Sequence, residues 1–178
     1  MITVTLGTIP YPFERAIDWL NILLYSNVIT EPVFVQHGTT DISSIAAHPL
    51  VATESVIGLT ELVAQVKQSR LVISHAGQGS TSLLADQGAS FVLLPRLARY
   101  KEHIDDHQLL FAKSVRKYGI QYCVNKAEVE QAILCPPPPF QGRLFNGSKL
   151  SDYLSDRYAK EPSFQRQERR WSVGNFSL

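Results

Sequence analysis

RLVISHAGQGSTSLLADQGASFVLL, residues 70–94, is the stretch that decides the fold of this 178-residue chain. Residues 70–74 form a predicted strand whose centre, residues 71–73, is an apolar run, and a glycine-rich turn follows it. From Ser80 the pattern predicts a helix that ends near Gly88, because serine is a good N-cap residue and glycine often ends a helix. Residues 90–94 form the next strand. A strand, a crossover helix and a second strand make up the repeating unit of a parallel sheet.

The same alternation continues on both sides of this stretch. The other predicted strands are residues 2–6, 33–35, 50–52 and 120–124, and the other predicted helices are residues 13–25, 59–66, 105–115 and 127–134. The chain is therefore expected to be α/β, a Rossmann-like open parallel sheet with helices on both faces. We expect this domain to span residues 1–135, with a proline-rich spacer and a helical, basic tail over residues 136–178.

Composition narrows the classes of partner. The formal net charge is +1, so no strong positive field favours nucleic acid, which is not expected as a partner. Two cysteines are too few for a disulfide framework, and a reducing cytosol is the expected compartment. No apolar run approaches the roughly 18 residues that a membrane span needs.

Two glycine turns follow predicted strands, at the edge of a parallel sheet where ligands bind. Glycine lets the backbone approach a phosphate closely, and the free N–H groups at a helix start favour its negative charge. The longer turn has Leu83 near the place of the third glycine of a dinucleotide motif, and it lacks the lysine of a P-loop, so NAD and ATP are disfavoured. The candidate phosphate-binding residues are Gly7, Thr8, His75, Gly77, Gln78, Gly79 and Ser80.

A polar loop, PRLARYKEHIDDHQ (residues 95–108), falls on the same predicted edge. Carboxylate and amide groups suit sugar hydroxyls, which both donate and accept hydrogen bonds. The two aspartates are also explained as N-cap and first-turn residues of the next helix. A metal site formed by His103, Asp106 and His107 is the alternative, but their spacing matches no zinc motif, so no metal is expected.

Three blocks, in this order, resemble a known family. They are VTLGTIPYPFERAIDWL (residues 4–20), SHAGQGS (residues 74–80) and the polar loop at residues 95–108. They are similar to PssE-type polysaccharide glycosyltransferases and to the catalytic subunit of the two-part UDP-GlcNAc transferase of dolichol-linked oligosaccharide synthesis. More distantly they resemble the carboxyl-terminal half of MurG, the glycosyltransferase family 28 C-terminal domain. The resemblance covers about residues 1–134.

The resemblance implies the donor-binding half of a GT-B enzyme split across two chains. Such an enzyme transfers, with inversion, a hexose-type sugar from a UDP-sugar to a lipid-diphosphate-linked acceptor in exopolysaccharide or glycan synthesis, without cofactor or metal. The expected partner is a PssD-type membrane-anchored subunit that recruits the lipid-linked sugar. This chain would then be cytoplasmic and peripheral at the inner face of the membrane. Homodimer formation by the isolated chain stays open.

By matched position, the resemblance places Gly7 and Thr8 beside the diphosphate and the longer glycine turn around it. The residues that would face the donor sugar and ribose are Glu102, His103, Asp106, His107 and Gln108, with His103 and Glu102 as the catalytic candidates. Leu83 stands where relatives carry an acidic residue tied to the ribose, which favours an alternative function as a non-catalytic nucleotide-sugar-binding regulatory or scaffold subunit. A GT-B epimerase needs both halves in one chain and is disfavoured by length.

Overall fold

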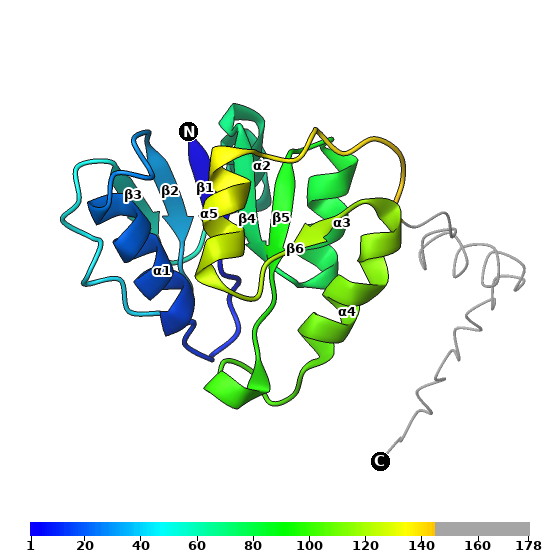
Figure 1. Cartoon of the computed structure of the whole chain (residues 1–178), viewed down its shortest axis with the longest axis horizontal. Helices are drawn as coiled ribbons and strands as arrows, with labels where there is room; N and C mark the ends of the chain where they lie inside the picture. Colours follow the sequence, from blue (N-terminus) through cyan, green and yellow to red (C-terminus); the bar gives the residue numbers. More distant parts are fainter. Residues whose placement is uncertain (145–178) are drawn as a thin grey trace, which may run out of the picture. The chain divides into compact units, whose positions relative to one another are not determined.

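The computed structural model describes residues 1–144, which fold around one parallel sheet of six strands (Figure 1). The strands are β1 (Ile2–Thr5), β2 (Val33–Gln36), β3 (Val51–Glu54), β4 (Leu71–His75), β5 (Phe91–Leu94) and β6 (Gln121–Tyr122). Their order across the sheet is β3-β2-β1-β4-β5-β6, and all neighbouring pairs are parallel. The chain winds from β1 to one edge, returns to place β4 beside β1, and then winds to the other edge. This reversal makes β1 and β4 the switch point, beside which open α/β sheets bind ligands.

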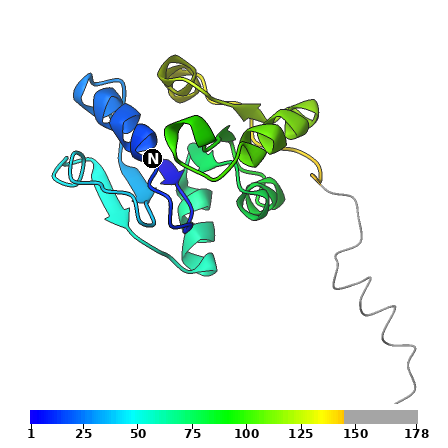
Figure 2. The ribbon, with the colours of Figure 1, turned by 90° about the horizontal axis from the view of Figure 1, so that it is seen from below.

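Within the described residues, five α-helices cover the sheet. They are α1 (Glu14–Tyr25), α2 (Leu59–Gln68), α3 (Gln78–Asp86), α4 (His107–Val115) and α5 (Lys126–Leu134), with 3-10 turns η1 (Ala98–Tyr100) and η2 (Arg116–Tyr118). Helices α1 and α5 contribute to one buried cluster, and α2, α3 and α4 contribute to another. Figure 2 shows α1 on one side of the sheet and α2 and α3 on the other. The predicted Rossmann-like fold, with helices on both faces, is confirmed.

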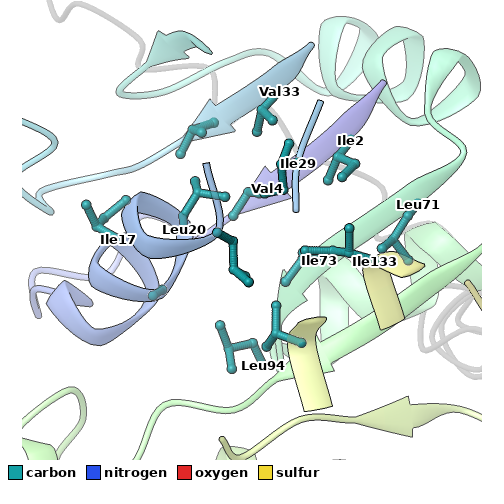
Figure 3. Packing of buried hydrophobic residues seen from close by; sticks show 14 of the residues in the cluster. Ile2, Val4, Ile17, Leu20, Ile29, Val33, Leu71, Ile73, Leu94 and Ile133 are labelled. Atoms are coloured by element: carbon teal, nitrogen blue, oxygen red, sulfur yellow. The ribbon is translucent and has the colours of Figure 1, made fainter. Parts of the chain in front are cut away.

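The strands send successive side chains to opposite faces, and both faces are buried. Val4 and Ile73 pack in the cluster that contains Ile17 and Leu20 of α1 (Figure 3). Val72 packs in the other cluster, which includes residues of α2 and α3. This is why the strands read as continuous apolar runs, as parallel strands do. Burying one such side chain stabilises the fold by about 2 kcal/mol. The packed sheet therefore holds the loops at its edges in fixed positions.

Helix α3 begins earlier than the sequence predicts. Its N-cap is Gly77, in an extended conformation, and the helix starts at Gln78, two residues before the expected N-cap Ser80. The backbone N–H and the hydroxyl of Thr81 both donate to the carbonyl of Gly77, at 2.9 and 2.8 Å, and these bonds close the first turn. The prediction that Ser80 caps the helix is therefore wrong, and Ser80 lies inside the first turn.

The packed unit extends beyond the boundary expected at residue 135. The N–H of Phe140 donates to the carbonyl of Ala89 at 2.9 Å, and the Phe140 ring lies 6.2 Å from the ring of Phe91. Leu144 is buried in the same cluster. The domain thus includes chain that the sequence analysis placed in a spacer. The helix and the basic end predicted for the tail lie outside the described residues.

Candidate active site

Three loops meet at the carboxyl edge of the sheet. They follow β1, β4 and β5, and because all the strands are parallel, the glycine turns and the polar loop lie on one edge. Figure 1 shows this edge, with the η1 loop at the same end of the sheet as the start of α1. The switch point lies between the first two of these loops. The sequence analysis expected the glycine turns and the polar loop to share this edge, and they do.

The imidazole of His75 fills the space between the two glycine turns. A Cβ atom added at Gly7 would lie 2.9 Å from His75 Nε2, and one added at Gly77 would lie 2.5 Å from the same atom. Gly7 also has a φ of +77°, which side chains rarely adopt. Both glycines are therefore required by the histidine between them, in addition to any approach of a ligand.

His75 is neutral at physiological pH. Burial lowers its pKa from 6.5 to about 4, and the positive charge of Arg96 acts in the same direction. The carbonyl of Thr5, 3.3 Å from Nδ1, opposes this shift by favouring the protonated ring. The imidazole of His75 is thus a neutral hydrogen-bonding group at the switch point, and it offers no positive charge to a phosphate.

The Gly7 turn is fastened to its neighbours by a buried glutamine, Gln36 at the end of β2. Its amide donates to the carbonyl of Gly7 at 3.0 Å and accepts from the N–H of Gly7 at 3.1 Å. It also accepts from the hydroxyl of Thr5 at 2.8 Å and donates to the carbonyl of Ser55 at 2.9 Å. One side chain therefore joins the ends of the first three strands and fixes the shape of the first glycine turn.

The start of α3 is open. Gln78 and Gly79 are exposed, and a Cβ atom added at Gly79 meets no heavy atom of the described chain within 4 Å. The N–H groups of Gln78, Gly79 and Ser80 belong to a first turn, where helix geometry provides no acceptor, and no other acceptor for them lies within residues 1–144. Free amides at the positive end of a helix favour an anion such as a phosphate.

A buried arginine joins the loop after β1 to the loop after β5. Arg96 is only 1% exposed, and its guanidinium donates to the carbonyls of Leu6 at 2.7 Å, Tyr11 at 2.6 Å and Glu102 at 3.2 Å. Its guanidinium carbon lies 4.6 Å from the ring centre of Phe13. Burial lowers the pKa of Arg96 to about 10, which the charge of Glu102 partly offsets, so the side chain stays protonated. Arg96 thus sets the spacing of two loops that border the switch point.

This arrangement matches known proteins. A family model for the glycosyltransferase family 28 C-terminal domain matches residues 33–135, which is more than half of the chain. The chain belongs to this family. No curated protein sequence matches it significantly.

Two solved structures share the fold of this family 28 domain. The glycotransferase of kitacinnamycin superposes with a TM-score of 0.54 at 15% identity, over 74% of this chain and 33% of that protein. Acinetobacter baumannii MurG superposes with a TM-score of 0.52 at 18% identity, over 74% of this chain and 40% of MurG. The chain therefore corresponds to one half of a GT-B architecture and spans about a third to two fifths of the length of these proteins.

In the family 28 domain, Glu102 has a different position from the one expected of a catalytic group. It is 2% exposed, and its two oxygens accept from Arg15 Nε and Nη2, each at 2.8 Å, and from the N–H of Leu97 at 2.9 Å. Arg15 also lines an open cleft of about 600 Å³ between the start of α1 and η1, together with Trp19 and Tyr100. Both carboxylate oxygens are engaged by the protein, which is the arrangement of a group that positions the loop, and Glu102 also borders this cleft. Its catalytic role stays a prediction.

Asp106 and Gln108 also turn toward the loop backbone. Asp106 accepts from the N–H of Ala98 at 2.8 Å, and the side-chain oxygen of buried Gln108 accepts from the N–H of Arg96 at 3.1 Å. The sequence analysis aimed both side chains at a sugar and gave Asp106 an alternative structural role at the start of the next helix. Asp106 is the N-cap residue of α4, but its side chain accepts from the loop and not from the helix. These contacts hold the polar loop in shape.

His103 and His107 do come together, but around Asp105 and not Asp106. The two imidazole centres are 4.3 Å apart, and Nδ1 of both rings lies within ion-pair distance of Asp105 Oδ1. The His103 ring stacks on Tyr11 at 5.7 Å. The N–H and ring of His107 lower the pKa of Asp105, with smaller contributions from the charges of both histidines. The carboxylate that the sequence analysis placed in this group is therefore corrected from Asp106 to Asp105.

Sequence reasoning missed Gln36, Arg15 and Arg96 as members of the site. Each looks like an ordinary polar residue of a strand end, helix start or loop, and each acts through partners far along the chain. The one available signal was position: Gln36 and Arg96 both lie at or just after the carboxyl end of a strand, where the ligand-binding edge begins. The remaining predicted residues, including exposed Thr8, lie at this edge.

Proposed function

We propose that this family 28 domain binds the donor of an inverting glycosyltransferase, a UDP-sugar, with the diphosphate against the first turn of α3. The observation that carries the proposal is the set of free N–H groups at Gln78, Gly79 and Ser80, beside the switch point of the sheet. The open space over Gly79 leaves room for a phosphate at van der Waals distance from the backbone.

The chemistry follows from this position. An acceptor hydroxyl attacks the anomeric carbon of the donor sugar from the face opposite UDP, the bond from that carbon to the β-phosphate oxygen breaks, and UDP leaves with the bonding electrons. Charge therefore grows on the diphosphate in the transition state. The amides of α3 are fixed before the reaction starts, and one such donor lowers the barrier by about 3 kcal/mol. The transfer needs no metal in this proposal.

The acceptor hydroxyl must lose its proton to a general base. Glu102 is engaged by Arg15, and Nδ1 of His103 is directed at Asp105. Glu102 is therefore not free in the way that a general base requires, whereas the contact at Nδ1 of His103 leaves its Nε2 available, as in an imidazole base that a carboxylate orients. We therefore propose His103 as the candidate base within this chain, and the alternative is a base supplied by the acceptor-binding half on a partner chain.

The partner we propose is a PssD-type membrane-anchored subunit, and the acceptor is a lipid-diphosphate-linked sugar in exopolysaccharide or glycan synthesis. Among the helices of residues 1–144, none has both the length and the hydropathy that a membrane crossing requires. In this proposal the chain works at the cytoplasmic face of the membrane through its partner. The motif resemblance and the match to one half of a GT-B architecture support it.

Binding of the donor is tested by thermal unfolding of the isolated chain with a panel of UDP-sugars. A ligand at 100 times its dissociation constant stabilises the folded state by about 2.7 kcal/mol, which raises the melting temperature of a chain of this size by about 5 to 10 °C. The expected result is such a shift with one sugar and a smaller shift with UDP alone. Absence of a shift with every UDP-sugar at millimolar concentration would end the donor-binding proposal.

A second function rests on Leu83, which is half-buried in α3 where motif relatives carry an acidic residue. Without that carboxylate the domain would bind a nucleotide sugar as a non-catalytic regulatory or scaffold subunit. The assay that separates the two functions measures UDP release by the chain co-expressed with its membrane partner. Release that depends on a lipid-linked acceptor supports the enzyme, and donor binding without release supports the regulatory subunit.

A further inference from the structure

The loop before α4 gathers three side chains of a kind that bind metals. We name His103, Asp105 and His107 the His–Asp cluster. The ligand atoms of the three side chains all lie within 4.8 Å of one another. They occupy alternate positions of one short segment at the carboxyl edge of the sheet, and Tyr11 of the neighbouring loop supports the His103 ring by stacking.

The contacts within the cluster bring its donor atoms to one point. The N–H of Asp105 lies 3.4 Å from Nδ1 of His103. The same nitrogen lies 3.3 Å from Oδ1 of Asp105, and Nδ1 of His107 faces that oxygen as well. Metal ligands bind in their deprotonated form, so an ion in this position takes the place of the protons that the nitrogens and the carboxylate share.

One distance in the cluster agrees with a metal ion of ordinary size. Bonds of about 2.0 to 2.1 Å to zinc place tetrahedral ligand atoms about 3.3 Å apart. His103 Nδ1 and Asp105 Oδ1 already have this separation. His107 Nδ1 lies 2.5 Å from Asp105 Oδ1, which is closer than two ligands of one ion, so the two side chains have to move apart to bind it. Both are more than half exposed, which leaves them room for this rotation.

We propose that the His–Asp cluster is a binding site for a divalent transition-metal ion of the zinc class. Two imidazole nitrogens and one carboxylate oxygen favour zinc, cobalt or nickel over magnesium and calcium, which prefer oxygen ligands. Three protein ligands leave at least one coordination position for water or a ligand oxygen. The cluster belongs to a different loop from the amides of α3, and binding of the ion does not depend on the proposed transfer reaction.

The test is calorimetric titration of the full-length chain with zinc chloride, using protein purified without a polyhistidine tag. Exposed Cys135 is replaced by serine throughout, because a free thiol also binds zinc. The cluster variants are Asp105→Asn and His107→Gln, both at exposed positions where folding is expected to survive, as circular dichroism would verify. The control is His48→Gln, which removes an imidazole outside the cluster. Magnesium chloride serves as the second titrant.

The expected result is one zinc ion per chain and no comparable binding of magnesium. Each cluster variant should weaken zinc binding by at least about tenfold, the effect that even loss of an outer-shell partner often has, whereas His48→Gln should leave it unchanged. Equal zinc affinity in all variants would mean adventitious binding and would overturn the proposal. So would the absence of zinc binding by the parent chain at millimolar concentration. A UDP titration of the same variants reports on the donor site separately.

Discussion

Gly79 offers the sharpest test of the phosphate position, because a side chain there changes binding without disturbing the folded chain. Glycine inside a helix is less favourable than alanine by about 0.5 to 1 kcal/mol. Gly79 lies in α3, and an added Cβ atom meets no heavy atom of the described residues within 4 Å. Gly79→Ala should therefore raise the free energy of unfolding by up to about 1 kcal/mol. Gly79→Val should leave it nearly unchanged, because the β-branched side chain loses part of that gain.

Binding of UDP should respond in the opposite direction. The added methyl groups stand in the space where the phosphate has to approach the free amides of the first turn. A hydrogen bond to a charged group contributes about 1.5 to 3 kcal/mol. Loss of one such bond weakens affinity by about 10- to 100-fold. Gly79→Val should lose more affinity than Gly79→Ala, because its side chain fills more of the cradle.

The assay pairs calorimetric UDP titration with thermal unfolding of the unliganded variants. Gly58→Val is the control. Gly58 is the N-cap residue of α2, and a Cβ atom added there also meets no heavy atom of the described chain within 4 Å. It follows the edge strand β3 and not the switch point of the sheet. It should bind UDP like the parent chain. Unchanged UDP affinity in a folded Gly79→Val variant would refute the placement of the diphosphate at α3.

Gly77→Ala supplies the contrasting result. Its Cβ atom would lie 2.5 Å from Nε2 of His75, and the ring has no room to retreat because the Gly7 turn bounds its other side. Such overpacking costs about 1 to 3 kcal/mol. Here the loss should appear in the unliganded chain, and His75→Ala in the same chain should relieve it. If the Gly77→Ala variant has the same melting temperature as the parent chain, the His75 ring does not fill the space beside Gly77.

Two further predictions concern the residues that hold the edge together. The pKa of His75 is 6.5 in the unfolded chain and about 4 in the folded chain, so between these two pH values the unfolded state binds more protons. The contribution of His75 to the free energy of unfolding is therefore complete above about pH 6.5. About 3 kcal/mol of it is lost as the pH falls to 4. Chemical denaturation across this range should show a shallower pH dependence for His75→Gln, and equal slopes would contradict the buried neutral ring. Glu102→Gln leaves the guanidinium of Arg15 without its anionic partner and should lower the free energy of unfolding by about 3 to 5 kcal/mol. A Glu102→Gln variant that keeps its stability and loses only turnover would instead support the predicted catalytic role of Glu102.

The sequence by itself determined the fold class and the edge that carries the site. Runs such as residues 71–73 and 91–94 are apolar at every position because parallel strands are buried on both faces, and the glycine turn between them marks the carboxyl end of the first strand. Local pattern also gave α1 and α5 nearly to the residue. These features depend on neighbours a few positions away, which one stretch of sequence contains.

Only the tertiary structure decided what each polar side chain does at that edge. Arg96 reaches the carbonyl of Leu6 across 90 residues of chain, and Glu102 pairs with Arg15 across 87. Asp105 and Asp106 are adjacent in sequence, yet one meets two imidazoles and the other caps a loop amide. The direction of a side chain in a loop is set by the backbone and by partners from other strands. A one-dimensional pattern places such residues at the edge of the sheet but leaves open whether they serve a ligand or the protein's own loops.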